Sequence, residues 1–259
     1  MPSEQERFAE LIADPEPPLD LGAAMIAACA CPGVDAGTQV DRLDDLAKGC
    51  PEASIDGLRA YLFEELGFAG DGEHYADPAN SYLHAVLDRR RGIPISLSVV
   101  LMEVGRRVGV HIGGVSMPGH FLAKSLHEPE LFIDAFRGGR LLGEPECREL
   151  FGLLHNELEF TPSFLDVVGS RSILWRMLNN LRQGFASRGD LANLRWTVEL
   201  QLEFPDIPVA ERRHLAALLG MSGNAARAAR ELESLAEALA PDDAESARRQ
   251  AHVLRSRMN

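Results

Sequence analysis

The feature that most constrains this chain is a helix that is apolar on nearly every side. It begins at Pro94, a residue suited to the first turn of a helix, and it ends at Gly109. Most of its circumference is covered by apolar residues, namely Ile95, Leu97, Val99, Val100, Leu101, Val104 and Val108. A helix that is apolar all round is a buried one. We therefore expect the rest of the chain to be organised around this helix.

The segments on either side of the buried helix predict a second helix and a sheet. A shorter helix precedes it, with Asp77 as N-cap, Pro78 at its first position and Gly92 as its stop. After Gly109 the pattern changes to short runs rich in β-branched and aromatic residues, which span 110–117, 120–124 and 131–136. Turn-forming and polar residues separate these runs. The pattern predicts a small antiparallel sheet.

The last two of these strands bring a histidine and a carboxylate together. If the polar loop 125–129 closes a hairpin centred on His127, then His120 opposes Asp134 and Leu122 opposes Phe132. Cross-strand Cβ atoms then lie about 4.5 to 5.5 Å apart. A histidine held by a carboxylate can serve as the base of a nucleophile–His–Asp arrangement. The nucleophile is expected at the N-terminus of the buried helix, where the helix dipole favours a thiolate.

This stretch resembles the core of the transglutaminase-like (papain-like) superfamily, in which a Gly-x-Cys motif opens the central helix and a His strand and an Asp strand follow. Counted back from Val108-Gly109-Val110, the cysteine position of that family falls on Pro94 in R-G-I-P, so the nucleophile is missing. His120 in P-G-H-F and Asp134 in F-I-D-A-F match the other two positions.

Several motifs together resemble a bacterial family that joins this degenerate core to tetratricopeptide-like helices, the invasion-regulator-type proteins. These motifs are N-S-Y-L, R-R-G-I-P-I-S-L-S, M-P-G-H-F-L and F-I-D-A-F-R-G-G. The resemblance implies an α+β fold. In it, a helical N-terminal layer and the buried central helix pack against a small antiparallel sheet, and an all-helical tetratricopeptide-like region follows.

Helices are also predicted before and after the central stretch. Caps, apolar stripes and prolines indicate helices at Gln5–Ala13, Leu19–Ala30, Asp35–Lys48, Ala53–Leu66 and Glu144–Leu154. Beyond Gly169 everything is predicted as helix, and Gly189-Asp190-Leu191 recurs as Gly223-Asn224-Ala225 thirty-four residues later. A period near 34 is typical of tetratricopeptide repeats. We predict one domain over 1–165 and a second over 166–259, and we expect so short an array to pack on the first domain.

Composition excludes several functions. The formal charge of −13 argues against binding to nucleic acid or to an anionic membrane. The four cysteines form no C-x-x-C and no zinc-type spacing, so we expect no metal and no cofactor, and a reducing compartment. The longest uncharged stretch, Leu21–Val34, is too short to span a bilayer, and the N-terminus lacks a basic leader. We predict a cytoplasmic protein.

The residues expected to line a cleft beside the His–Asp pair each have a structural alternative. Asn80 either faces the cleft or serves a helix start, and Arg91 belongs either to a solvated helix end or to a phosphate or acidic-partner site. Gly138 and Gly139 either admit a substrate or form a turn with positive φ. Apart from Ser98, Ser96 is the only hydroxyl near Pro94, and it is either a surrogate nucleophile or a partner for backbone amides. His74 and Tyr75 either line the cleft or cover the edge of the core.

Two functional hypotheses follow. In the first, the chain is a non-catalytic protein-binding or regulatory module, and His120 and Asp134 remain as a structural pair. In the second, it is a hydrolase or acyl transferase in which Ser96 or an activated water works with that pair. The first is favoured because a proline at position 94 removes both the thiol and a backbone donor. A protein partner is expected, and no feature indicates the oligomeric state.

Overall fold

The structure, a computed structural model, describes residues 3–237 and 239–256. Within these residues the chain forms two compact units, one from Pro15 to Met177 and the other from the N-terminal segment before Pro15 together with the chain from Leu178 onward. We predicted a division between residues 165 and 166, whereas these units divide after Met177 and also place the N-terminal segment with the C-terminal helices. The domain boundary at 165 and 166 stays a prediction.

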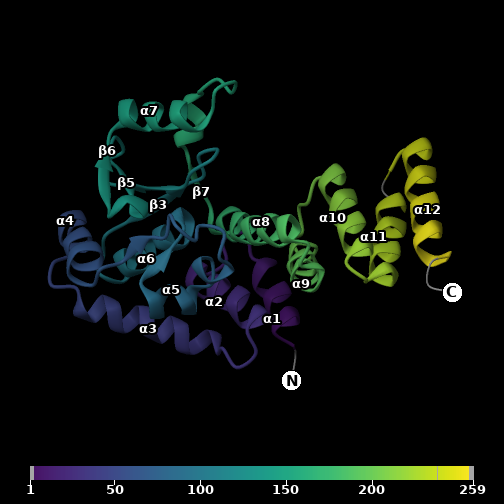
Figure 1. Ribbon diagram of the computed structural model, residues 1–259, viewed down its shortest axis with the longest axis horizontal. Helices are drawn as coiled ribbons and strands as arrows, with labels where there is room; N and C mark the ends of the chain where they lie inside the picture. The colour runs from purple at the N-terminus through teal and green to yellow at the C-terminus, as the bar shows by residue number, and fades with distance from the viewer. Residues whose placement is uncertain (1–2, 238, 257–259) are drawn as a thin grey trace. The chain divides into compact units, whose positions relative to one another are not determined.

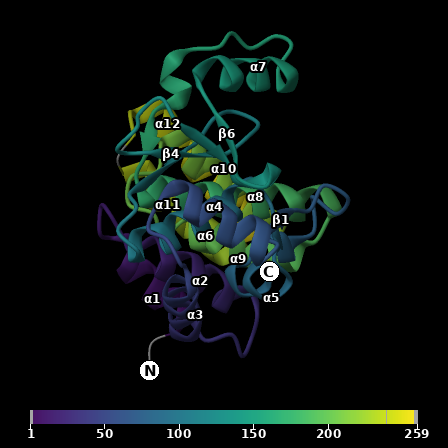
Figure 2. The ribbon, with the colours of Figure 1, turned by 90° about the vertical axis from the view of Figure 1, so that its left-hand side faces the viewer.

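The first unit is built on the buried helix α6 (Pro94–Arg107), which the sequence predicted. Four helices pack against α6: α2 (Leu19–Ala30), α3 (Ala36–Gly49), α4 (Ile55–Arg59) and α5 (Leu83–Arg89). A π-helical turn, Ala60–Glu65, continues α4. Strands β3 (Ile112–Val115) and β4 (Leu122–Ser125) also contact α6. Figures 1 and 2 show α6 between α3 and the sheet.

The main sheet of the described residues has five antiparallel strands in the order β6-β5-β4-β3-β7. The three predicted strands are its centre, with β5 spanning Phe132–Asp134. The edge strands β6 (Arg140–Leu142) and β7 (Val167–Val168) were not predicted, because they are too short to show an alternating pattern. A separate parallel pair joins β1 (Ala69–Gly70) to β2 (Arg91–Gly92). Short 3-10 helices of one turn each lie at η2 (Pro78–Asn80), η3 (Ala135–Arg137) and η4 (Pro162–Leu165).

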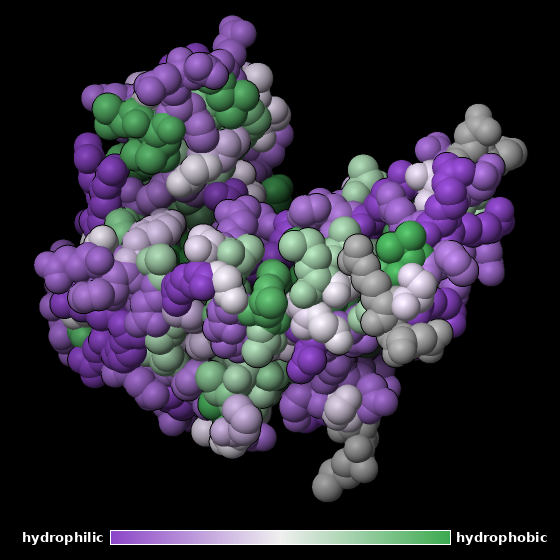
Figure 3. Space-filling model, turned by 45° about the vertical axis from the view of Figure 1, so that its right-hand side comes forward, coloured by the Kyte–Doolittle hydropathy of each residue, from purple (hydrophilic) through white to green (hydrophobic). Residues whose placement is uncertain are grey.

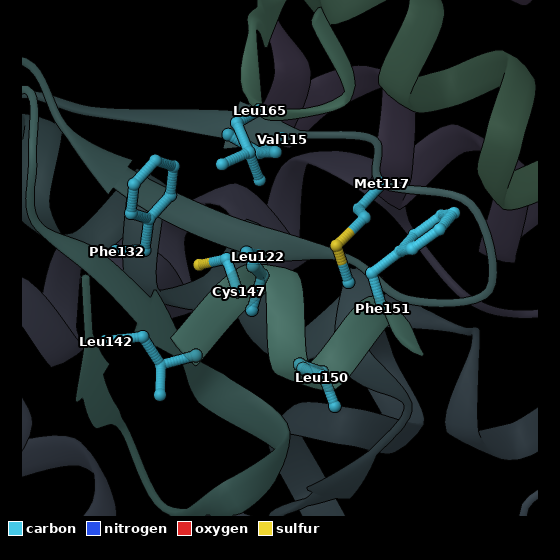
Figure 4. Close-up of a cluster of buried hydrophobic side chains, with 9 residues drawn as sticks. All are labelled: Val115, Met117, Leu122, Phe132, Leu142, Cys147, Leu150, Phe151 and Leu165. Carbon is cyan, nitrogen blue, oxygen red and sulfur yellow. The ribbon is translucent and has the colours of Figure 1, made fainter. Parts of the chain in front are cut away.

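Helix α7 (Glu144–Leu154) covers the face of the sheet opposite α6. Figure 4 shows the apolar side chains that fill this layer, where Val115, Leu122 and Phe132 of the strands meet Cys147 and the other buried side chains of α7. Because both faces of the sheet are covered, the side chains on both faces of its strands are apolar.

The predicted helix between Asp77 and Gly92 was wrong in its extent. Asp77 caps as expected by accepting from the backbone N–H of Ala79, but it closes only the turn η2 before α5 begins. The helix then stops at Arg90, which has φ 54°. Arg90 donates from Nη1 to Leu66 O at 2.7 Å, and its own carbonyl accepts from Ala69 N. Pairing with β1 therefore ends the helix before Gly92.

The second unit is entirely helical in its described residues. Its helices are α1 (Glu4–Ile12), the part of α8 (Ser170–Arg188) from Leu178, α9 (Leu191–Gln201), α10 (Val209–Met221), α11 (Ala225–Glu237) and α12 (Pro241–Ser256). From α9 to α12 each helix packs on the next. Helix α1, which we expected in the layer against α6, instead contacts α9, and Phe8 lies 6.1 Å from Phe204 between ring centroids.

The repeat in this unit has a local structural basis. Gly189 and Gly223 both adopt positive φ, 68° and 98°. Asp190 and Asn224 follow them, and each accepts a bond from the backbone N–H three residues later. The helical character of this region was predicted correctly, while its assignment to the tetratricopeptide class stays a prediction. No helix in the described part of the chain is long and apolar enough to cross a membrane.

Buried charges join α6 to the helices beneath it. Arg107 donates to Asp20 of α2 at 2.6 Å, to Glu103 at 2.7 Å and to Asp44 of α3 at 2.6 Å. The side chains of Arg107, Asp20 and Glu103 are only 10%, 8% and 6% exposed. Burial raises the pKa of the Glu103 carboxyl, while its bonds to Arg106 and Arg107 oppose that rise. Removal of Arg107 would leave two buried carboxylates short of a partner.

We predict that Arg107→Ala lowers the free energy of unfolding by about 3 to 5 kcal/mol, because breaking a buried ion pair leaves an uncompensated charge. Urea denaturation followed by circular dichroism measures this loss. Lys48→Ala is the matched control, since Lys48 and Asp45 form an ion pair in which both side chains are 74% exposed. A loss as small for Arg107→Ala as for the control would contradict the assigned role.

Candidate functional site

His120 and Asp134 form a buried pair at one end of the inner strands β4 and β5. His120 Nε2 lies 3.0 Å from Asp134 Oδ1, and the two side chains are 8% and 0% exposed. His120 follows the Pro118-Gly119 turn, in which its backbone N–H donates to Met117 O, while Asp134 ends β5. The predicted proximity of the two groups is therefore confirmed by geometry.

The predicted hairpin register was wrong by two residues. The observed partners are Ala123 with Ile133 and Lys124 with Phe132, so the loop is centred on Glu128 and not on His127. Ser125 moves the centre, because its Oγ accepts from Glu128 N and its own N–H donates to Leu131 O. A shift of two residues keeps every side chain on its face of the sheet. His120 and Asp134 therefore still meet, although as diagonal neighbours.

The pair uses one nitrogen of the histidine ring, and the other, Nδ1, has no hydrogen bond among the described residues. An ionised carboxylate only accepts, so in that form Asp134 would accept from the N–H of His120 Nε2. Asp134 Oδ1 also accepts from Arg137 N at 3.3 Å, and Arg137 Nη1 lies 3.7 Å from Oδ2. Oδ2 is enclosed and has no hydrogen-bond partner among the described residues. The arrangement can orient an imidazole base, and it can equally tie two strands together.

Arg176 of α8, which sequence reasoning missed, holds the turn that carries His120. Its Nη1 donates to Ser116 Oγ at 2.7 Å and to Met117 O at 2.9 Å, and its Nη2 donates to His120 O at 2.9 Å. Burial lowers the pKa of this guanidinium. The sequence signal was a single charge within an otherwise apolar run of α8. Arg176 positions His120 through the backbone.

Aromatic rings border the pair. Phe136 lies edge-on to His120, with centroids 6.3 Å apart, and Tyr75 lies edge-on to Phe136 at 5.8 Å. Gly70 permits this packing, because a Cβ there would lie 2.5 Å from the Phe136 ring. Tyr75 is 49% exposed, so the row of rings runs from solvent to the buried imidazole. Tyr75 thus covers the outer end of this row of rings, and its assignment to a cleft stays a prediction.

Ser96 and Asn80 lie together at the start of α6. Ser96 Oγ donates to Asn80 O at 2.6 Å and accepts from Ile93 N at 3.1 Å. Asn80 is buried, and its Nδ2 donates to His74 O at 2.8 Å and to Asp71 Oδ2 at 3.2 Å. Neither residue has a hydrogen bond to His120 among the described residues. The Ser96 side chain therefore serves the backbone at the helix start, and the Asn80 side chain holds the segment from Asp71 to His74.

Pro94, Gly138, Gly139 and Arg91 occupy different settings. Pro94 is buried in the first turn of α6. Gly138 and Gly139 form the turn between β5 and β6 with φ of 69° and 72°, and Gly139 N donates to Asp134 O at 2.9 Å. A Cβ at Gly139 would lie 2.5 Å from the Phe63 ring, whereas Gly138 faces open space. Arg91 is exposed on β2. Of this set, the structure joins only the glycine turn directly to the His–Asp pair.

None of the four cysteines is at the start of α6. Cys147 is buried in the layer under α7, where burial raises the pKa of its thiol to about 12. Cys29, Cys31 and Cys50 are partly exposed, and none of them is in a disulfide. The described residues contain no group of three or more His, Cys, Asp or Glu side chains that could hold a metal ion. A thiol that stays protonated at neutral pH is a poor nucleophile.

We predict that Ser96→Ala lowers the free energy of unfolding by about 1 to 2 kcal/mol, because it removes the side-chain partners of a buried helix start. Differential scanning calorimetry measures the loss. Ser98→Ala provides the control, since Ser98 Oγ is also buried but has no hydrogen-bond partner in the described chain. Equal melting temperatures for the two variants would show that Ser96 has no structural role.

Comparison with known proteins agrees with this geometry. Residues 36–179, more than half of the chain, match the family model of the transglutaminase-like superfamily. The UPF0162 protein of Xylella fastidiosa strain 9a5c is 41% identical over 136 residues, which are 50% of this chain and 48% of that protein. The UPF0162 protein of Pseudomonas aeruginosa is 36% identical over 149 residues, 57% of this chain and 53% of that protein.

A eukaryotic protein matches the same kind of region. F-box only protein 21 of Mus musculus is 34% identical over 167 residues, which are 59% of this chain and 26% of that protein. The chain thus spans about half the length of the bacterial relatives it matches. No solved structure gives a significant match.

Proposed function

This chain belongs to the transglutaminase-like superfamily, and from that premise we propose that it is a non-catalytic, cytoplasmic module that binds a protein partner or regulates one. The observation that carries the proposal is the pairing of an intact His120–Asp134 dyad with a proline at the helix start. Pro94 supplies neither a thiol nor a backbone N–H. The resemblance places the nucleophile of the superfamily at that position.

An apolar surface beside the dyad supports a binding role. Leu153, Leu154 and Leu158, here called the leucine surface, are 75%, 44% and 48% exposed. Figure 3 shows hydrophobic side chains gathered at the end of the first unit formed by α7 and the segment after it. Grouped exposed apolar side chains mark sites of protein interaction. We propose the successively packed helices α9 to α12 of the second unit as a further surface, of the kind that helical repeat proteins use.

The leucine surface adjoins the turn that carries His120. A Cβ at Gly119 would lie 2.8 Å from His155 Nε2 and 3.5 Å from Leu154 Cβ, so the Pro118-Gly119 turn lies directly against the end of α7. Arg176 ties the same turn to α8. A partner bound to the leucine surface would therefore lie next to the Pro118-Gly119 turn, which carries His120 of the dyad.

The alternative is a hydrolase or acyl transferase that uses Ser96 or a water with His120. No hydrogen bond favours the serine, because Ser96 Oγ donates to Asn80 O. The free Nδ1 of His120 could accept a proton from a water, which is the form of this alternative that remains chemically open.

We predict that His120→Ala lowers the free energy of unfolding by about 1 to 3 kcal/mol, because Asp134 loses its partner in a fully buried setting. His127→Ala, at an exposed histidine, is the control for thermal denaturation. A fluorophosphonate probe should not label the wild type. Labelling at Ser96 that disappears in His120→Ala, with stability unchanged, would establish the hydrolase alternative.

We also predict that Leu153→Asp abolishes capture of protein partners from a bacterial lysate and leaves the melting temperature unchanged. The substitution places a charge on an exposed apolar surface. There it would disrupt contact with a partner but not the packing of the core. Leu141→Asp, at a 36% exposed leucine of β6, is the control. If the same partners are recovered with both variants as with the wild type, the leucine surface is not the binding site.

A further inference from the structure

The leucine surface is bordered by carboxylates. Glu149 lies one helical turn before Leu153 on α7, and Glu157 and Glu159 flank Leu158 in the segment that follows. Side chains four residues apart on a helix are neighbours on one face, so Glu149 lies beside Leu153. We call Glu149, Glu157 and Glu159 the acidic border. All three residues are exposed.

The charges of the acidic border are uncompensated. None of its three carboxylates has a hydrogen bond or an ion pair with any residue in the described ranges. Between residues 144 and 161 the sequence has five Glu and a single Lys or Arg, which is Arg148. Arg148 donates from Nη2 to Glu144 at 3.2 Å, and its guanidinium lies 4.5 Å from the centroid of the Phe160 ring. The charge of Arg148 is therefore already engaged, and the border presents net negative charge to a partner.

The centre of the same surface is apolar. Leu153, its most exposed member, is 75% exposed, and a Cβ added to the neighbouring Gly152 would meet nothing within 4 Å. Figure 3 shows hydrophobic side chains with hydrophilic ones around them at this end of the first unit. An apolar centre with a polar rim is the usual composition of a protein–protein interface. Here the rim carries one sign of charge.

The sign of that charge disfavours two other occupants. A symmetric contact between two copies of the chain uses the same patch on both, and it would set the acidic border of one copy against that of the other. An anionic membrane would also be repelled by these carboxylates. A basic partner is the occupant that matches both the apolar centre and the rim.

Resting on the proposed function, we propose that the leucine surface binds a segment of another protein in which apolar side chains are flanked by Lys or Arg. The apolar side chains of the partner pack on Leu153 and Leu158, and its cations lie over the acidic border. Burial of the apolar side chains supplies the affinity. Charge complementarity at the rim speeds association and excludes acidic partners.

The test is calorimetric titration of the full-length protein with two acetylated peptides of equal length. One consists of three Leu-Lys-Lys-Leu repeats, and the other has Glu in place of every Lys. We expect saturable binding of the lysine peptide, at least about tenfold tighter than that of the glutamate peptide. Its affinity should fall as the salt concentration rises from about 0.05 to 0.5 M, because salt screens exposed charges. No saturable binding of the lysine peptide, or equal affinity for the two peptides, would overturn the proposal.

Two double variants locate the binding. Glu149→Lys with Glu157→Lys reverses the charge of the acidic border, and a loss of affinity for the lysine peptide of about tenfold or more is expected. Asp41→Lys with Glu64→Lys changes the net charge equally, at two other exposed carboxylates that have no ion pair among the described residues. This control should keep the affinity of the wild type. An equal loss in both variants would show that the peptide responds to the overall charge of the chain, which refutes the assignment to the leucine surface.

A third variant tests the apolar centre. Leu153→Ser with Leu158→Ser should also weaken binding of the lysine peptide by about tenfold. Its melting temperature should stay that of the wild type, because both side chains are exposed. Unchanged affinity in this variant would show that charge alone binds the peptide and would refute the apolar contacts.

Failure of this proposal can be told from failure of the proposed function. If the lysine peptide does not bind while Leu153→Asp still abolishes capture of partners, the chain is a binding module whose partner has another chemistry. If Leu153→Asp captures the same partners as the wild type and the lysine peptide does not bind, both proposals for the leucine surface are wrong.

Discussion

The complete burial of α6 is the constraint on which the rest of the first unit depends. A helix with apolar residues on every side must be covered all round, and here α2, α3, α4 and α5 cover part of it while β3 and β4 cover the remainder. The buried charges of its last turn then require partners, which Asp20 and Asp44 supply from α2 and α3. One helix thus sets the placement of both the helical layer and the sheet.

The His120–Asp134 pair is fixed in place by its surroundings. Its members are buried, and their surroundings hold them from three directions: Arg176 through the turn before His120, Arg137 through the carboxylate, and Phe136 along the imidazole edge. These contacts are useful to the fold whether or not a reaction takes place. The helix start is satisfied in a similar way, because Ser96 bonds backbone groups that would otherwise be left unpaired. These contacts support the proposal that the pair now serves the fold and that Pro94 stands where the superfamily has its nucleophile.

Local signals in the sequence predicted most of the first unit. The bounds of α2 and α7 agree with the prediction to the residue, because proline, capping and apolar spacing act within one or two turns. Prediction failed where an element depends on a distant partner. Helix α5 stops early because Arg90 is drawn to β1, and α1 left the expected layer because Phe8 packs near Phe204. The hairpin register shifted by two residues because Ser125 builds a longer loop, although the same face remained buried.

The sequence by itself determined the buried helix, the central strands, the absence of a cysteine at the helix start and the identity of the histidine and carboxylate that pair. These follow from composition and spacing along the chain, which act before any long-range contact forms. Only the tertiary structure decided the strand register, the short edge strands, the support of His120 by Arg176 and the ion pairs of Arg107 with Asp20 and Asp44. Each of these depends on groups far apart in the sequence that meet only when α6 is covered, and no local pattern encodes such a meeting.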